Sequence, residues 1–543
     1  MTFNSGTATD HLDMLDQLVE VLTSRHLATV AINAGGTGHA IGDIIDITAT
    51  GSTSTHLCKI EVVTLAGSAI ATARVYRGGA YTVDPTTTTA NAQSASTGAG
   101  TGATFDLTFA ATGWTQLQRN SELDTADSIA AAGTGYSIGD DLTLIGGVLA
   151  EGGSAATLNV DTLSGSGVAT VSILTRGEYE VFPSDPVLTS VSPSGGTGCT
   201  LNLTPRNLTG ETVVTLQGDA GSSIDPLVGI KTYSDISDQT SLNTVFNWAL
   251  FGLTAWSATD RLDQQANITQ GFDTSANDGT LTPTLTTGTG SYVPMKDSDA
   301  FNMVWSIRAD GRSFALCTRV ESATTNYNSQ CAAGLLNSYG TTTELPFPAF
   351  VAGATDRRNA WWKDVGSAWG GLADVVGQSS SIGGPVSVWQ PEGSWVRCIA
   401  GIFSGATDTT PSYTQGGNSP RTAVWPLGNS NAHEEADDQI FEAAPTSGFD
   451  NDRITAVSSR VELFRTPNTG EDLFALYPVT YMRNDSATDI FRTFGELPGV
   501  FWFHVADATI SSEDRWTQYP DAYSIFQNGT RIDTWSFLAL KED

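Results

Sequence analysis

The sequence is poor in charged residues, and above all in basic ones. Charged residues make up 15% of the 543 residues, against roughly 25% in an average soluble domain. The 26 Lys and Arg are outnumbered by 58 Asp and Glu, which gives a formal net charge of −32. Because a negative surface repels phosphate groups, we expect neither nucleic acid nor an anionic membrane as a partner.

Long apolar runs and a cysteine framework are missing too. The longest apolar stretch, residues 248–256, is far shorter than the roughly 20 residues of a membrane helix, and the first ten residues do not resemble a signal peptide. The five cysteines are an odd number without a C-x-x-C pair. This argues against a disulfide scaffold and predicts buried, reduced thiols in a cytoplasmic protein. A Cys317–Cys331 bridge is the alternative.

Small polar residues and aromatic residues are abundant. The chain holds 56 Gly and many Thr and Ser, and its 13 Trp, 13 Tyr and 22 Phe need a core. Thr favours strands, and Gly-rich segments favour turns. The length suggests about three or four domains. We therefore expect a mainly β protein with an N-terminal helix, two tandem small β modules, and a large Trp-rich β-sandwich-like domain.

The first 26 residues predict an amphipathic helix. Thr9 or Asp10 can cap it, and its apolar face follows helical spacing: Leu12, Leu15, Leu18, Val19 and Leu22. A helix of this length is marginal alone, so the apolar face must pack against something. We expect it at a subunit interface in a closed ring. Packing on the first β module is the alternative.

An internal repeat follows. Residues 37–43 (TGHAIGD) match 134–140 (TGYSIGD), and residues 100–107 (GTGATFDL) match 196–203 (GTGCTLNL). We expect two β modules of one topology at 27–112 and 128–207, joined by a polar linker at 113–127. The Gly-rich turns at 35–38 and 132–135 should superpose. In the cores, Phe105 should be equivalent to Leu201, and Leu107 to Leu203.

Residues 208–543 differ in composition. They contain 12 of the 13 Trp, in short strand-like segments separated by loops rich in Gly, Ser, Asn and Pro. We expect one large β-rich structural domain with insertions here, or two interleaved ones. Four of its Trp are candidates for stacking on sugar rings, although packing in a core is the more common role of Trp: Trp361, Trp362, Trp389 and Trp395.

Motifs for catalysis or cofactors are incomplete. Residues 135–139 (GYSIG) match G-x-S-x-G, but that nucleophile motif needs a strand-to-helix turn in an α/β fold. Ser137 also aligns with Ala40 in the first copy, so we interpret it as a turn residue. The Gly-Thr-Gly turns do not complete G-x-G-x-x-G, and no Gly-Lys dipeptide exists, which excludes a P-loop. Ala40 also replaces the Asp of a calcium-binding β-roll.

Metal and acid–base chemistry lack a clear signature as well. The cluster of His433, Glu434, Glu435, Asp437 and Asp438 does not have H-E-x-x-H spacing, so a solvated loop is favoured over a metal site. With 58 acidic residues, no glycosidase pair can be nominated. We therefore assign no catalytic, cofactor-binding or metal-binding residues, and expect that the protein is not an enzyme.

Several phrases in the last two thirds of the chain resemble a known family. They are residues 225–235 (DPLVGIKTYSD), 247–252 (NWALFG), 495–502 (GELPGVFW), 523–528 (YSIFQN) and 537–540 (FLAL). Together they resemble structural virion proteins of tailed bacteriophages, and the T-G-x-x-x-G-D modules are similar to accessory β modules of phage tail and neck proteins.

The resemblance implies assembly and no catalysis. We expect a virion protein, made in the host cytoplasm, that forms a symmetric ring or sheath around the tail or neck. Its expected partners are copies of itself and other tail, neck or portal-proximal proteins. The alternatives are a receptor- or glycan-binding tail protein and, less favoured, a virion enzyme that degrades polysaccharide. Glycan binding and polysaccharide cleavage would distinguish them.

Overall fold

Strands dominate the computed structural model of the chain, which confirms the expectation of a mostly β protein. The structure describes residues 1–47, 51–83, 85, 88–150, 152–208, 212–221, 224–232, 248–269, 291–293, 303–321, 326–341, 343–345, 348–353, 386–389, 393, 395–398, 421–425, 476–485, 490–504, 513–518, 521–527 and 536–542. In this part of the chain, no helix is long and apolar enough to span a membrane.

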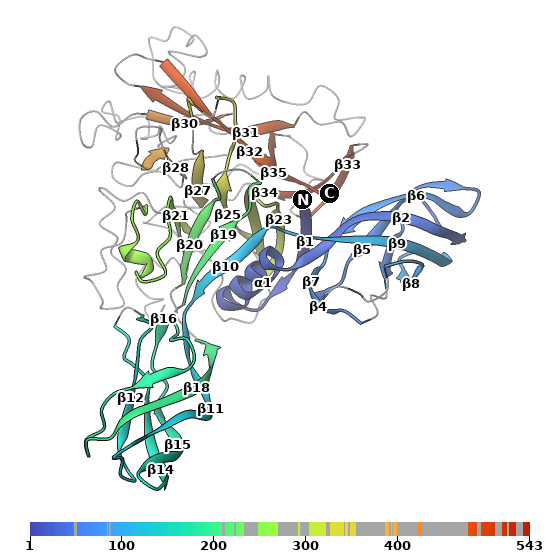
Figure 1. Cartoon of the computed structure of the whole chain (residues 1–543). Coiled ribbons are helices and arrows are strands. Elements are labelled where there is room, and N and C mark those ends of the chain that lie inside the picture. The colour runs from blue at the N-terminus through green and yellow to red at the C-terminus, as the bar shows by residue number, and fades with distance from the viewer. Residues whose placement is uncertain are drawn as a thin grey trace.

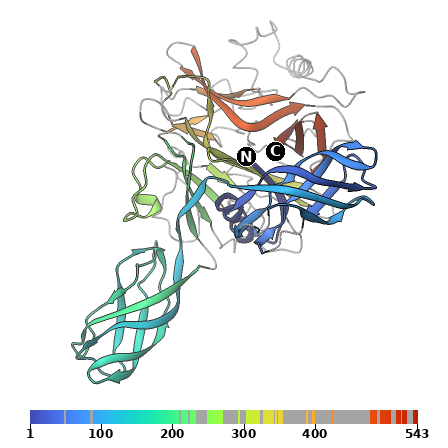
Figure 2. The same ribbon diagram turned by 45° about the vertical axis from the view of Figure 1, so that its right-hand side comes forward.

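Two eight-stranded sheets carry the sequence repeat (Figures 1 and 2). We call the first module 1; its strand order is β4 (Thr53–His56), β7 (Ala80–Val83), β2 (Arg25–Thr37), β9 (Thr101–Ala111), β8 (Asn91–Ser96), β3 (Ile44–Ile47), β5 (Lys59–Ala66), β6 (Ala69–Arg77). We call the second module 2; its order is β13 (Val148–Leu149), β16 (Tyr179–Val181), β11 (Ser121–Thr134), β18 (Thr197–Asn207), β17 (Val187–Thr189), β12 (Asp141–Ile145), β14 (Thr157–Ser164), β15 (Gly167–Thr175). Taken along the chain, each strand of one sheet corresponds to one strand of the other.

The two modules have equivalent interiors. Phe105 and Leu201 are both fully buried, and Leu107 and Leu203 are nearly so, which confirms the predicted register on this face. The hydroxyl of Tyr81 accepts a hydrogen bond from the Cys58 N–H at 2.9 Å. In module 2, the hydroxyl of Tyr179 accepts the equivalent bond from an N–H at 2.8 Å, that of Ala156. These two tyrosines fix the alignment of the modules.

Three further sheets form the rest of the described structure. One has the order β10 (Trp114–Arg119), β19 (Val213–Gly218), β20 (Leu227–Thr232), β21 (Trp248–Leu253), β22 (Ser291–Val293). The second has β1 (Thr2–Ala8), β23 (Met303–Ala309), β24 (Ser313–Glu321), β25 (Asn326–Leu335), β27 (Ala349–Gly353), β28 (Val386–Trp389), β29 (Trp395–Cys398). The C-terminal sheet has β30 (Arg421–Trp425), β31 (Tyr477–Asp485), β32 (Ile490–His504), β35 (Ser536–Lys541), β34 (Asp521–Gln527), β33 (Arg515–Gln518), with β26 (Asn337–Ser338) paired to β32.

The five-stranded sheet and the sheet containing β1 share one apolar core with helix α1 (His11–Thr23). We call these two sheets with α1 the core domain. Asp10 caps the helix, since its carboxylate accepts hydrogen bonds from the N–H groups of Leu12 and Asp13, both at 2.9 Å. Leu15, Leu18 and Leu22 are fully buried there, beside aromatic residues from both sheets. The apolar face of the helix is therefore covered within its own chain, mainly by strands of the core domain, and Ala80 of module 1 belongs to the same cluster. A subunit interface near the helix stays a prediction.

Two short segments that precede the modules in sequence belong to the core domain. Strand β1 lies beside β23, with Thr2 opposite Ala309, and β10 lies beside β19, with Trp114 opposite Gly218. The expectation that residues 1–26 are only a helix and that 113–127 are a polar linker is therefore wrong. Segment 113–127 reads as polar because β10 buries few residues, among them Trp114 and Gln118. Modules 1 and 2 are thus inserted into the core domain, before and after β10.

Candidate interaction surfaces

The repeated T-G-x-x-x-G-D motif forms a tight turn at the end of each module. In module 1 a carboxylate oxygen of Asp43 accepts the Ala40 N–H at 2.9 Å. In module 2 Asp140 accepts the Ser137 N–H at 2.8 Å, and this hydrogen bond holds the pKa of Asp140 below its usual value. Ser137 is exposed, and strand β12 follows the turn, not a helix. The G-x-S-x-G match is therefore a structural turn, because the geometry of a nucleophile elbow is missing.

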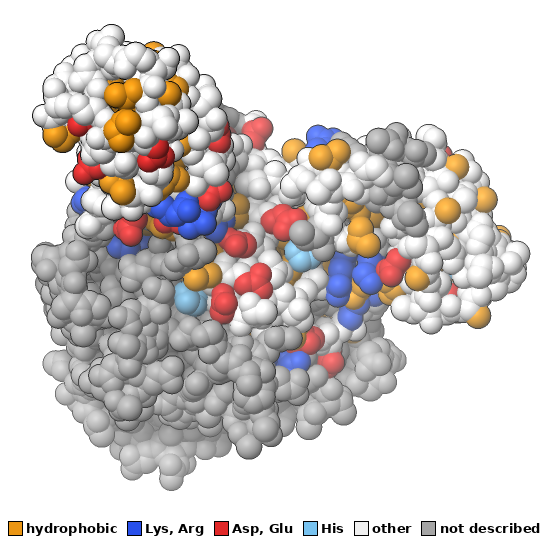
Figure 3. All heavy atoms as spheres, turned by 90° about the horizontal axis from the view of Figure 1, so that it is seen from below, with side chains coloured by type: hydrophobic (Ala, Val, Ile, Leu, Met, Phe, Trp, Pro, Cys, Tyr) orange, Lys and Arg blue, Asp and Glu red, His pale blue; other side chains and the backbone are white. Residues whose placement is uncertain are grey.

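Each turn presents an apolar side chain to solvent. Ile41 and Ile138 occupy the same position in the two motifs, and each is 68% exposed. Module 2 exposes several more large apolar side chains: Ile145, Leu149, Leu174, Leu188 and Val191. Ile145 lies directly opposite Leu188 across β12 and β17. Figure 3, seen from the side toward which module 2 projects, shows hydrophobic side chains over this lobe at the upper left. Such surface on an acidic protein is typical of a contact site.

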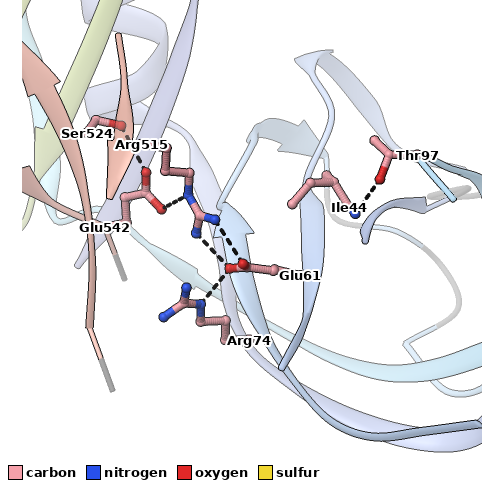
Figure 4. A network of polar contacts seen from close by, with 7 residues as sticks. All are labelled: Ile44, Glu61, Arg74, Thr97, Arg515, Ser524 and Glu542. Carbon is pink, nitrogen blue, oxygen red and sulfur yellow. Dashed lines mark hydrogen bonds and ion pairs between the residues drawn. The ribbon is translucent and has the colours of Figure 1, made fainter. Parts of the chain in front are cut away.

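Module 1 is fastened to the C-terminal sheet by a network of charged side chains (Figure 4). Arg515 on β33 donates two hydrogen bonds to the Glu61 carboxylate on β5, at 2.9 and 2.6 Å. Its Nε donates to Glu542 at 2.7 Å. Arg74 on β6 donates to Glu61 at 2.6 Å, and the Ser524 hydroxyl donates to Glu542 at 2.9 Å. We call this group of five residues the module 1 clamp.

The clamp changes the acidity of its members in opposite directions. Burial alone would raise the pKa of Glu61, but hydrogen bonds from Arg515 and Arg74 outweigh it, and the pKa is lowered. For Glu542 burial dominates over the attraction of Arg515, and its pKa is raised. Arg515 and Glu542 both belong to the C-terminal sheet and its end, so only Glu61 and Arg74 are contributed by module 1.

A second attachment holds module 1 at the loop between β6 and β7. The Asn4 side chain on β1 donates to the Gly79 carbonyl at 3.1 Å and accepts the Gly79 N–H at 2.8 Å. The Gly78 N–H donates to the Phe3 carbonyl at 3.0 Å. Module 1 is therefore fixed to the core domain and to the C-terminal sheet at two separate places.

The same face of module 2 carries different residues. Asn159 takes the place of Glu61 and Ser172 that of Arg74, because each pair lies directly opposite across equivalent hairpins. Leu174 near the end of β15 is 53% exposed. Among the described residues, no ion pair joins this face of module 2 to another part of the chain. The face that docks module 1 is therefore open to solvent in module 2.

The cysteines are structural in the described part of the chain. Cys58, Cys199, Cys317 and Cys331 are free and buried, and burial raises the pKa of each thiol. Cys317 lies opposite Gln330 on the neighbouring strand, whereas Cys331 lies opposite Leu316. Successive residues of a strand point to opposite faces, so the two thiols lie on different faces of the sheet. The alternative of a Cys317–Cys331 bridge is wrong for this structure.

Two of the four candidate sugar-binding tryptophans lie in described segments, and both pack within the chain. The rings of Trp389 and Trp395 meet edge to face, with centroids 5.6 Å apart. The Trp395 indole N–H donates to the Asn267 carbonyl at 2.7 Å, and its ring covers Gly252. They therefore serve packing. Trp361, Trp362 and the cluster at 433–438 lie outside the described residues.

Among the described residues, no group of three or more His, Cys, Asp or Glu side chains is arranged to hold a metal ion. No protein-family model matches the chain, and no curated protein matches it.

Sequence reasoning missed the charged residues that attach the modules. Glu61 and Arg515 lie 454 residues apart in sequence, and no local pattern connects them. Comparison of the two repeats would have marked the positions, because Glu61 and Arg74 correspond to Asn159 and Ser172. A charged pair present in only one of two copies indicates a contact that only this copy makes.

Proposed function

We propose that the protein is a structural protein of a tailed-bacteriophage virion, which assembles with copies of itself into a symmetric ring or sheath around the tail or neck. One observation carries the proposal. Module 2 projects from the core domain with exposed apolar side chains, although the equivalent module 1 is docked within the same chain (Figures 1 and 3). In a chain of net charge −32, an apolar surface that is not used internally favours contact with another protein.

The proposal includes the layout of the chain and its partners. Modules 1 and 2 are separately folding β domains inserted into one larger β domain. Neighbouring copies and other tail, neck or portal-proximal proteins are the partners. The acidic surface disfavours nucleic acid and anionic membranes, and buried thiols suit assembly in the reducing host cytoplasm. Strand-and-turn phrases that resemble phage virion proteins support the assignment.

The mass of the purified full-length protein, measured by light scattering, tests the assembly. We expect a multiple of the 57.0 kDa chain. A variant with Ile145→Lys and Leu188→Lys places two charges on the exposed pair of module 2 and should reduce the assembled fraction. A variant with Leu57→Lys and Val83→Lys, at two module 1 residues of similar exposure, is the matched control and should not. A monomer at all concentrations, together with absence of the protein from gold-labelled phage particles, would contradict the proposal.

The projection of module 2 also suits a receptor-binding arm, which is the second candidate. Its far end carries Ile138 and Val191, which are 68% and 66% exposed. Binding of the protein to host cells or to a glycan array, lost in an Ile138→Lys variant but kept in Ile41→Lys, would favour this candidate. Cleavage of a polysaccharide by the purified protein would instead favour a virion enzyme.

A further inference from the structure

Module 2 is joined to the core domain through a narrow base (Figure 2). Asn120 is the single residue between β10 of the core domain and β11 of module 2. Its N–H donates to the Val213 carbonyl at 3.0 Å, and its carbonyl accepts the Leu208 N–H at 3.1 Å. These backbone bonds hold the two chain crossings together, and a third contact joins module 2 to the core domain at this base.

Glu180 provides that third contact. It belongs to β16 of module 2 and is only 4% exposed. One of its carboxylate oxygens accepts a hydrogen bond from the Gln118 side-chain amide at 2.5 Å and another from the Leu262 N–H at 2.9 Å. Gln118 lies on β10, and Leu262 begins the short helix η1 (Leu262–Gln264). Both donors therefore belong to the part of the chain that module 2 stands on.

The fold of the module does not require an acid at this position. Glu180 follows the core residue Tyr179, just as Thr82 follows Tyr81 in module 1, and Thr82 is exposed. The same β module thus folds with a small neutral residue here. A buried carboxylate is present at this position only in module 2, the copy with the narrow base. We therefore interpret Glu180 as a residue that attaches module 2 to the core domain.

The surroundings of Glu180 favour its neutral form. Among the described residues, no Lys or Arg forms an ion pair with it. The nearby Arg261 binds Asp263 through two hydrogen bonds at 2.8 and 2.9 Å, and Arg119 of β10 binds Asp16. Burial raises the pKa of Glu180, and the charge of Asp263 adds to this, while the bonds from Leu262 and Gln118 and the charge of Arg261 only partly oppose it.

A protonated Glu180 would also complete the hydrogen bonding at this base. The Gln118 side-chain oxygen is buried and has no hydrogen-bond partner in the described structure. An ionised carboxylate cannot donate to it, whereas a carboxylic acid has one O–H donor. A buried acceptor without a donor is unfavourable, so the proton would satisfy a group that the ionised form leaves unpaired.

We propose that Glu180, Gln118 and Leu262 form a latch that holds module 2 in a fixed direction when Glu180 is protonated and lets it swing about Asn120 when Glu180 ionises. Thermodynamic linkage sets the direction of this pH dependence. The latched state has the raised pKa and the released state an ordinary one, so the latch is strongest in acid and weakens as the pH rises through the raised pKa. Each unit of difference between the pKa of Glu180 in the latched state and in the released state changes the ratio of latched to released molecules about tenfold. The latch does not depend on the proposed function.

Distances between two spin labels in the full-length protein test the latch. One label replaces Thr23, exposed at the end of α1, and the other replaces Ser166, exposed in the turn between β14 and β15. Both are introduced as Cys in a background with Cys398→Ala, since the four described cysteines are buried. From about pH 8 to about pH 5, we expect a broad distance distribution to narrow to one distance in the wild-type protein.

Three variants separate the latch from a general effect of acid. Glu180→Gln stays neutral, and its amide can donate to Gln118, so we expect the narrow distribution at every pH. Glu180→Ala should give the broad one at every pH. Glu178→Gln removes an exposed acid two residues away and should keep the pH dependence of the wild type. A wild-type distribution that does not change with pH, or one that changes equally in Glu180→Gln, would overturn the latch.

Discussion

Modules 1 and 2 have the same strand order and equivalent cores but differ in how they are attached to the rest of the chain. Module 1 is bound at two places, by the clamp around Arg515 and by Asn4. Module 2 rests on a narrow base with a buried acid, Glu180. The difference lies in surface residues that the fold does not need: Glu61 and Arg74 in one copy, Glu180 in the other. Two copies of one domain are therefore attached differently through a few polar residues.

The largest expected effect comes from breaking the clamp. Glu61→Ala leaves Arg515 and Arg74 without their shared carboxylate, and removing one partner of a buried ion network typically costs about 3–5 kcal/mol of unfolding free energy. Asn159→Ala at the equivalent position of module 2 should change it by less than about 0.5 kcal/mol. Denaturant unfolding of the two full-length variants measures both. Equal losses would show that the two faces are not used differently.

Acidification should affect the two attachments in opposite directions. The pKa of Glu61 is lowered, so docking of module 1 is stable above the ordinary pKa of Glu, about 4.3, and is lost as the pH falls through the lowered value. The raised pKa of Glu542 has little influence, because that residue stays beside Arg515 whether or not module 1 is docked. Spin labels at Thr23 and Ser68, the module 1 equivalent of Ser166, should show one distance at neutral pH and a broader range in strong acid. A distance distribution between the labels at Thr23 and Ser68 that broadens as the pH rises would contradict this prediction.

A smaller, equal effect is expected inside the two modules. Tyr81→Phe and Tyr179→Phe each remove the hydroxyl that accepts a backbone N–H, of Cys58 and of Ala156. Leaving a buried N–H without an acceptor costs about 1–3 kcal/mol. Thermal unfolding should show losses that agree within about 0.5 kcal/mol. A loss in only one variant would mean that the interiors are less alike than their strand order.

The smallest effect is expected at the serine of the G-x-S-x-G match. Ser137→Ala places in module 2 the residue that module 1 already has, Ala40. The Asp140 carboxylate binds the backbone N–H of residue 137 and not its side chain. We expect the unfolding free energy to change by less than about 0.5 kcal/mol and every activity to remain. Loss of a hydrolytic activity in this variant would show that the two turns are not equivalent in function.

The sequence was informative where the structure is local and repeated. The two T-G-x-x-x-G-D turns and the burial of Phe105 and Leu201 follow from period-two alternation between glycines. The core domain was not predictable in this way, because β1 and β10 pair with strands far along the chain. The apolar face of α1 shows that the helix must pack against other residues, but it does not identify those residues. The polar residues of the two attachments carry no local signal, since their partners come from distant segments.

Single-particle images of the full-length protein at about pH 8, sorted by conformation, test the contrast between the two modules most directly. We predict that module 1 keeps one position on the core domain in all classes, while module 2 takes a range of directions about its base. Images in which module 2 is as fixed as module 1, or in which module 1 also leaves the core domain, would contradict it.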